Sequence, residues 1–363
     1  MGVKRPRGVC PFKLCACPEM RSRRLFFGEP CAINSPVMSF RQRLLVAFAF
    51  LPASHAFAQS GDCLHWTVPV TIVNRNGALV EGLTASDFRA GLRGKPVRIL
   101  SVAKDDRPHR IVILLDVSGS MFGVNGTKWS LAWASAFHLA QSNLPKTSLA
   151  LLVFRTDIVE RVDFSQGTTA VSERLKQIGE DVTYKKNIRG QTALFDTVIE
   201  GLKLLGPPTQ GDVIYVITDG GDNKSRNSPR EVQHALESAG VRLYALILSH
   251  LDGHMPNTPE EEYGKSNLLQ VIDATGGMQF EPIELSPFGA RLDKDERLRI
   301  AKGLQVYYEQ MVHPYLVQIE LPGIQEKPTG WRLKLSDEKN HKVKGGQVAY
   351  PRELMPCTLV PAN

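Results

Sequence analysis

The sequence predicts an α/β protein with a doubly wound, mostly parallel sheet, flanked by small β-rich N- and C-terminal segments. Between residues 109 and 313, short apolar runs alternate with segments in which apolar residues recur at helical spacing. The run 111–115 (IVILL) has no polar face, as expected of a strand buried on both sides of a parallel sheet. Stretches in which polar and apolar residues alternate lie before and after this block, and they predict the flanking strands.

The central block is expected to alternate between strand and helix. Its strands are expected at 111–115, 149–154, 158–164, 213–217, 241–248 and 277–282, with 158–164 pairing as an antiparallel edge. Its helices are expected at 129–140, 192–205, 229–239, 266–274 and 296–313. The flanking segments are expected to contain strands at 66–73, 98–102, 316–321 and 331–335.

These elements divide the chain into four parts. They are a leader over 1–58, a β-rich segment over 59–108, the α/β domain over 109–313 and a second β-rich segment over 314–363. Each flanking segment is too small to bury a hydrophobic core alone. We therefore expect the two to pack on each other as a discontinuous sandwich, with the α/β domain inserted between its parts.

The net charge of the chain, +7, does not indicate a nucleic-acid partner once the charges are located. Nine of the 44 Lys and Arg residues lie in 1–58, but only two of the 37 Asp and Glu residues do. The remainder of the chain therefore carries no net charge, and we expect no nucleic-acid partner.

The leader contains the ordered signals of a secretory signal peptide. After Met38, the arginines at 41 and 43 form a positive region, 44–51 is apolar, and 56–58 (AFA) is a small-x-small cleavage site. We expect Met38 to be the true start and Gln59 the first mature residue. The chain would then be exported, to the periplasm or the medium, with no membrane span after cleavage. A buried N-terminal helix and an uncleaved membrane anchor are the alternatives.

Cysteine usage agrees with export. Four of the six cysteines precede the expected cleavage site, which leaves only Cys63 and Cys357 in the mature protein. An even pair in an exported chain indicates a disulfide, and two free thiols are the alternative.

Oxygen-bearing side chains follow two of the apolar strands. Asp116, Ser118 and Ser120 come directly after 111–115, and Asp219 comes after 213–217. Thr192 lies between them in sequence, at the expected start of a helix. Ligands of open α/β sheets bind at the carboxyl ends of the strands, so we expect these five side chains to converge there.

Two carboxylates and several hydroxyls, with no His or Cys, describe a site for a hard cation. Mg²⁺ is favoured over zinc, with Mn²⁺ or Ca²⁺ as alternatives. Two carboxylates neutralise one divalent ion, which would stay electrophilic toward an extra anionic ligand. Gly119 is expected to let the first loop turn tightly. Taken one at a time, the serines and Thr192 could instead be helix caps, and Asp219 a turn residue.

Three motifs together resemble the metal-ion-dependent adhesion site of von Willebrand factor A (VWA) domains. They are DVSGS at 116–120 followed by Met, a Gly-x-Thr before a helix, and ITDGGDN at 217–223. The resemblance covers residues 110 to about 285. It implies that the serines and Thr192 bind the metal directly and that the aspartates act partly through water. It also implies that an Asp or Glu of a partner protein completes the coordination.

The wider pattern is similar to bacterial secreted "VWFA-related domain" proteins. The shared features are the leader, the stretch VPVTIVNRNGALVEGLTASDF, the A domain and a β tail ending in GGQVAYPREL. The tail departs from the usual pattern in several places.

The function expected from these features is an exported, metal-dependent protein-binding module rather than an enzyme. A rim for the partner is expected at Asp222, Asn223, Asp252 and Glu260, the last two in the polar segment 249–264. A structural role in a cell-envelope assembly is one alternative, and a metal-dependent hydrolase is another. A haloacid-dehalogenase-like phosphatase would need a second Asp where Ser118 stands, and no serine-hydrolase or nucleotide-binding motif occurs.

Overall fold

The computed structural model describes residues 63–122, 126–181, 184, 189–248, 259–282, 294–343 and 345–357, all within one compact unit, Ala58–Asn363. The leader, with its expected start at Met38 and cleavage before Gln59, lies outside the described residues. The same is true of Asp252 in the expected rim.

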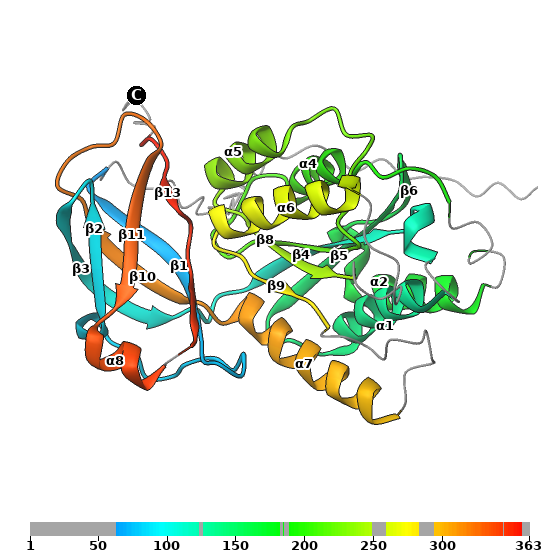
Figure 1. Ribbon diagram of the computed structural model, residues 1–363, viewed down its shortest axis with the longest axis horizontal. Helices are drawn as coiled ribbons and strands as arrows, with labels where there is room; N and C mark the ends of the chain where they lie inside the picture. The colour runs from blue at the N-terminus through cyan, green and yellow to red at the C-terminus, as the bar shows by residue number, and fades with distance from the viewer. Residues whose placement is uncertain are drawn as a thin grey trace, which may run out of the picture. The chain divides into compact units, whose positions relative to one another are not determined.

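A six-stranded sheet forms the centre of the α/β part (Figure 1). Its strands are β4 (His109–Asp116), β5 (Thr147–Phe154), β6 (Ile158–Val162), β7 (Val213–Thr218), β8 (Arg242–Ile247) and β9 (Gln279–Phe280). They lie in the order β6-β5-β4-β7-β8-β9, and all neighbours are parallel except β6, which is antiparallel to β5. The predicted α/β fold with an antiparallel edge is therefore present, and the sheet is mixed.

Helices cover both faces of this sheet (Figure 1). They are α1 (Thr127–Gln141), α2 (Gly167–Glu180) and α7 (Lys294–Val312) on one face, and α4 (Leu194–Leu205), α5 (Pro229–Ala239) and α6 (Pro259–Ala274) on the other. Short 3₁₀ turns lie at η1 (Ala85–Asp87), η2 (Gly119–Phe122) and η4 (Phe164–Gln166). Among the described residues, no helix is long and apolar enough to cross a membrane.

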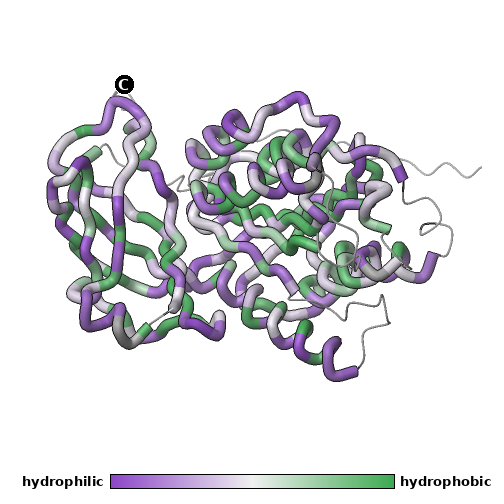
Figure 2. The backbone as a smooth tube through the Cα atoms, in the orientation of Figure 1, coloured by the Kyte–Doolittle hydropathy of each residue, from purple (hydrophilic) through white to green (hydrophobic). Residues whose placement is uncertain are grey.

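The central strands are buried on both sides, as their composition predicts. Every residue of β4 from 111 to 116 is fully buried. Ile111, Ile113 and Leu115 pack with α1, α2 and α7, whereas Val112 and Leu114 pack with α4, α5 and α6. In Figure 2 the hydrophobic colour follows these strands between the helices. Apolar burial therefore fixes the strand ends from which the candidate site is built.

The two flanking segments join in a second, seven-stranded antiparallel sheet. Its strands are β1 (His65–Val73), β2 (Phe88–Leu92), β3 (Lys95–Lys104), β10 (Tyr315–Glu320), β11 (Thr329–Leu335), β12 (Gln347–Ala349) and β13 (Glu353–Leu354), with α8 (Asp337–Lys342) between β11 and β12. Their order is β12-β1-β10-β3-β2-β11-β13, so strands of both segments are interleaved. The segments were expected to face each other as a sandwich; instead they hydrogen-bond within one sheet.

This second sheet must curl. Its two edge strands, β12 and β13, are separated in sequence only by residues 350–352. Four peptide steps span at most about 14 Å, whereas seven flat strands at a spacing of about 4.8 Å would place the edges about 29 Å apart. Curling also encloses a core of its own, to which Val70, Val317 and Trp331 contribute.

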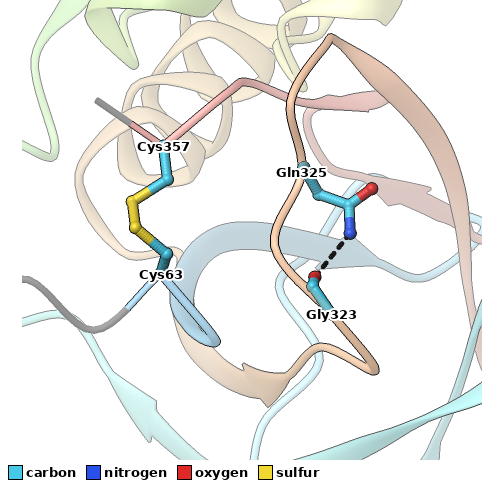
Figure 3. The surroundings of a disulfide bond; sticks show 4 residues. All are labelled: Cys63, Gly323, Gln325 and Cys357. Atoms are coloured by element: carbon cyan, nitrogen blue, oxygen red, sulfur yellow. Dashed lines mark hydrogen bonds between the residues drawn. A yellow bond between two sulfur atoms is a disulfide. The ribbon is translucent and has the colours of Figure 1, made fainter. Parts of the chain in front are cut away.

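The expected disulfide joins the ends of the two flanking segments (Figure 3). Cys63 and Cys357 are bonded, with 5.5 Å between their Cα atoms. The Cys357 amide donates to the backbone oxygen of Gln325 at 3.3 Å, which holds the last described residue against the loop before β11.

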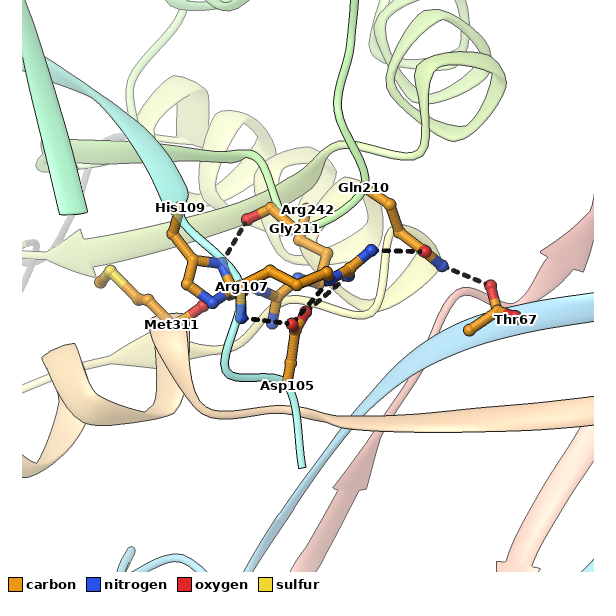
Figure 4. A network of polar contacts seen from close by, with 8 residues as sticks. All are labelled: Thr67, Asp105, Arg107, His109, Gln210, Gly211, Arg242 and Met311. Atoms are coloured by element: carbon orange, nitrogen blue, oxygen red, sulfur yellow. Dashed lines mark hydrogen bonds and ion pairs between the residues drawn. The ribbon is translucent and has the colours of Figure 1, made fainter. Parts of the chain in front are cut away.

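A polar network ties the two sheets together where β3 leads into β4 (Figure 4). The buried carboxylate of Asp105 accepts hydrogen bonds from Arg107 Nε at 2.8 Å and Nη2 at 2.6 Å. Arg107 Nη1 donates to Gln210 Oε1 at 3.0 Å, and Gln210 Nε2 donates to the Thr67 carbonyl at 2.6 Å. The network therefore links the segment before β4 and the segment before β7 to β1.

Candidate metal centre

Strand register brings the two candidate carboxylates to neighbouring strand ends. Leu115 of β4 lies opposite Ile217 of β7, so Asp116 ends its strand beside Thr218. The Thr218 hydroxyl donates to Asp116 Oδ2 at 2.7 Å. Asp219 follows immediately and, like Asp116, is fully buried. The convergence expected from two strand ends is therefore found for these residues.

The environment of Asp116 disfavours its charged form. Burial raises the pKa of this carboxyl to about 7, and the nearby charge of Asp219 adds to the rise. The Ser118 amide donates to Asp116 Oδ1 at 2.8 Å, which opposes the rise only in part. In the absence of a cation, the protein thus holds Asp116 beside a second buried carboxylate, in surroundings where Asp116 ionises unfavourably.

The two serines lie on the loop after β4 with their hydroxyls together. Ser118 Oγ and Ser120 Oγ are 3.3 Å apart, and Ser118 is buried. The loop is anchored by Gly119, whose amide donates to the Gly190 carbonyl at 3.0 Å. A Cβ on Gly119 would lie 3.4 Å from that oxygen, at van der Waals distance, so the two backbones approach each other closely here. Gly119 begins the 3₁₀ turn η2, and its φ is not positive.

Thr192 is buried. It lies on the same loop as Gly190, whose carbonyl accepts the hydrogen bond from Gly119. It precedes α4 by two residues and so does not begin the helix. Its amide donates to Asn223 Oδ1 at 2.9 Å, and its carbonyl accepts from the amides of Asn223 and Lys224 at 3.0 Å. The backbone of Thr192 is thus tied to the loop that follows Asp219.

Two of the residues expected in a partner rim, Asp222 and Asn223, accept hydrogen bonds from the backbone at 192–194. Asn223 binds the backbone of Thr192 as described, and Asp222 Oδ1 accepts from the Leu194 amide at 2.8 Å and from Ser225 Oγ at 2.6 Å. Glu260 lies in the first turn of α6, and its side chain is not among those described.

A lysine that sequence reasoning missed lies inside the centre. Lys128 Nζ is 3.3 Å from Asp219 Oδ2, and both side chains are almost fully buried. Asp219 Oδ1 is buried and has no hydrogen-bond partner among the described residues. The sequence contains one sign that Lys128 is buried. It lies four residues before the buried Ala132 and so on the same helix face, where an apolar residue is expected.

These residues fit a hard divalent cation. The donors are carboxylate and hydroxyl oxygens, which such ions prefer, and one buried carboxylate oxygen lacks a partner among the described residues. Within the described ranges, no group of three or more His, Cys, Asp or Glu residues could hold a metal. A cation here would therefore depend on the hydroxyls as well as the two carboxylates.

Comparison with known proteins gives a match to a protein family. Residues 86–262 match the family model described as "VWA domain containing CoxE-like protein". No curated protein matches the chain.

Several solved structures are similar at low identity. One is the conserved hypothetical protein BatB from Bacteroides thetaiotaomicron, at 15% identity and a TM-score of 0.40, covering 56% of this chain and 99% of that chain. An aerotolerance-related membrane protein from Bacteroides fragilis NCTC 9343 has 16% identity and a TM-score of 0.39, covering 55% and 98%. A von Willebrand factor type A protein from Catenulispora acidiphila has 14% identity and a TM-score of 0.39, covering 80% and 73%.

Proposed function

Because this chain contains a von Willebrand factor A domain, we propose that it is a protein-binding module whose metal site engages an acidic side chain of a partner protein. The residues that would hold the cation are Asp116, Ser118, Ser120, Thr192 and Asp219. The cation is of the magnesium type, Mg²⁺ with Mn²⁺ or Ca²⁺ as alternatives. The proposal assigns no catalytic residue.

The unpaired oxygen of Asp219 carries this proposal. A buried carboxylate oxygen without a hydrogen bond is costly, and a second buried carboxylate nearby increases that cost. A divalent cation between Asp116 and Asp219 would remove both penalties. The hydroxyls of Ser118 and Ser120, 3.3 Å apart on the adjoining loop, supply further oxygen donors of the right kind.

When bound, the cation supplies an open coordination position for a carboxylate of the partner. The protein's own residues set up that position. Asp116 and Asp219 would provide the negative charge at the strand ends, and Asn223 ties the backbone of Thr192 to the loop that follows Asp219. Since the strands beneath are fixed by apolar burial, the site does not need the ion in order to form.

We further propose that the protein works outside the cytoplasm, in the periplasm or the medium. The Cys63–Cys357 bond supports this compartment, because disulfides persist in oxidising surroundings. The ordered leader signals before Gln59 point the same way.

The test uses two variants of the site and a matched control. Asp116→Ala should abolish binding of Mg²⁺ and Mn²⁺ in calorimetry, because it removes one of two carboxylates. Thr192→Ala should weaken metal binding less and partner binding more, since the family resemblance assigns Thr192 to the ligand-engaged geometry. Asp157→Ala, an exposed aspartate near β6, should behave as the parent chain.

Circular dichroism should show that all three variants stay folded. Pull-downs from the exported fraction, with and without a chelator, report partner binding. Unchanged metal affinity in Asp116→Ala would rule out the site. Partner binding that survives a chelator would remove the proposed mechanism.

A further inference from the structure

Lys128 introduces a positive charge into a site that is proposed to hold a cation. It lies in the first turn of α1, with its side chain 3% exposed and Nζ 3.3 Å from Asp219 Oδ2. Asp219 itself is completely buried. Burying an ammonium group is expensive unless it is paired, so this ion pair is a fixed part of the interior.

The two oxygens of Asp219 have different surroundings. Oδ2 contacts the lysine, whereas Oδ1 is the buried oxygen without a hydrogen-bond partner among the described residues. One carboxylate can therefore bind the ammonium through one oxygen and serve a second cation through the other. The two positive charges would then lie on the same carboxylate, in a region from which water and salt are largely excluded.

The charge of the site follows from its members. Asp116 and Asp219 ionised together with Lys128 give a net charge of one negative unit. A divalent cation changes this to one positive unit, whereas without the lysine the loaded site would be neutral. The lysine thus repels the metal and, once the metal is bound, leaves the site with an excess positive charge that attracts an anion.

We propose that Lys128 is a built-in counter-ion that pairs with Asp219 in the metal-free protein, weakens metal binding and strengthens the attraction of the loaded site for a carboxylate. This inference rests on the proposed function only in assuming that a divalent cation binds between Asp116 and Asp219. It explains how the fold keeps two buried carboxylates in place before a cation arrives.

The test compares Lys128→Met, which keeps most of the length of the unbranched side chain but removes the charge, with Lys128→Arg, which keeps the charge. Lys203→Met, at an exposed lysine of α4, is the control for loss of a surface charge. Calorimetry with Mg²⁺ and Mn²⁺ gives the metal affinity. Thermal unfolding in a chelator gives the stability of the metal-free protein, and acetate titrated into the Mn²⁺-loaded protein probes anion affinity.

Lys128→Met should bind both metals about tenfold more tightly or better, because repulsion inside a poorly screened site is removed. Its metal-free form should melt at a lower temperature, and its metal-loaded form should bind acetate more weakly than the parent chain. Lys128→Arg and Lys203→Met should stay close to the parent chain in metal affinity.

A second pair of variants keeps the test decisive if Lys128→Met does not fold. Asp219→Asn removes the partner charge, and Asp219→Asn combined with Lys128→Met removes the whole ion pair. The double variant should bind metal more tightly than Asp219→Asn alone. Equal or weaker binding by the double variant would overturn the inference.

The outcomes separate this inference from the proposed function. If the parent chain binds metal and folded Lys128→Met binds it equally or more weakly, the lysine inference fails and the proposed function stands. If only Lys128→Met binds metal, the inference holds and the proposed function of the parent chain fails. If neither binds metal although both are folded, both ideas fail.

Discussion

Replacing Asp116 by asparagine should stabilise the metal-free protein, although it removes a proposed metal ligand. The side-chain amide that results would be neutral, whereas Asp116 is buried beside Asp219 and its pKa is raised to about 7 from the ordinary value of 3.8. The hydrogen-bond partners remain usable: the Ser118 amide can donate to the side-chain oxygen, and the Thr218 hydroxyl can turn to accept from the new amide.

The sign of the pH dependence follows from the raised pKa. In the folded protein Asp116 keeps its proton up to about pH 7, whereas in the unfolded chain it loses the proton near pH 4. The folded state is therefore most favoured at low pH and loses this stability as the pH rises from about 4 to about 7. A difference of about three pKa units corresponds to roughly 4 kcal/mol, and coupling to Asp219 makes about 2–4 kcal/mol the reasonable range.

The assay is urea unfolding in a chelator at pH 5 and pH 8. Asp116→Asn should exceed the parent chain in unfolding free energy by about 2–4 kcal/mol at pH 8 and by less at pH 5. Each kcal/mol should raise the melting temperature by roughly 2–4 °C. Asp157→Asn, at a side chain that is 68% exposed, is the matched control and should change little at either pH.

Added Mg²⁺ should reverse the order of the two proteins. It should stabilise the parent chain, because a ligand that binds only the folded state adds to its stability, and should leave Asp116→Asn unchanged. A variant that is less stable than the parent chain at pH 8 in the chelator would refute the reasoning about buried charge.

Three further predictions concern other parts of the chain. Replacing both Cys63 and Cys357 by serine should lower the unfolding free energy by about 2–4 kcal/mol, because the bond closes a loop with a sequence separation of 294; equal urea midpoints would contradict this. Glu237→Gln should stabilise the protein by about 1 kcal/mol at pH 8 and by almost nothing below pH 4. Burial raises the pKa of this partly buried carboxyl to about 7, so its ionisation destabilises the fold as the pH rises from 4.5 to 7. A flat pH profile of the stability difference would count against this prediction. N-terminal sequencing of the exported protein should begin at Gln59, and a mature form that retains Met38 would favour an anchored protein.

The central strands could be predicted because their signal is local. The run 111–115 is apolar without interruption, and β4 is buried on both faces. The boundaries of α5, Pro229–Ala239, agree with the prediction because Ser228 caps the helix and Gly240 ends it in a left-handed conformation. In each case a few adjacent residues determine the element.

Helix α2 (Gly167–Glu180) was not predicted, although its buried residues have helical spacing. Only Val171, Leu175 and Ile178 form its buried face, and the remaining positions are polar or small. Helix α6 begins at Pro259 rather than at 266, because the acidic residues that suggested a loop also suit the first turn of a helix. The weak apolar signal explains both errors.

The order of the seven-stranded sheet could not be predicted from the segments themselves. β10 lies between β1 and β3, so strands that are more than 200 residues apart in sequence pair along their length, as Val68 with Val317 and Val102 with Val317 show. Alternation of polar and apolar residues identifies such strands and their buried face, but it does not specify which strand lies beside which. The sandwich prediction failed for this reason.

The residues of the candidate site likewise differ in whether local sequence or contacts distant in sequence determine their position. Asp116 and Asp219 are placed by strand ends that the sequence shows directly, whereas Thr192 is placed by bonds to Asn223 and Lys224 on another loop. Position in sequence therefore predicts the two carboxylates, and only the folded chain reveals what holds Thr192. Lys128 comes from yet another element, a helix packed on the sheet, and its charge is significant only because Asp219 lies beside it. In the proposed site, the sheet fixes the negative charges, whereas the positive charge and the hydroxyls come from surrounding elements. Changes in those elements would then alter the proposed cation affinity and ligand preference while the carboxylates stay in place.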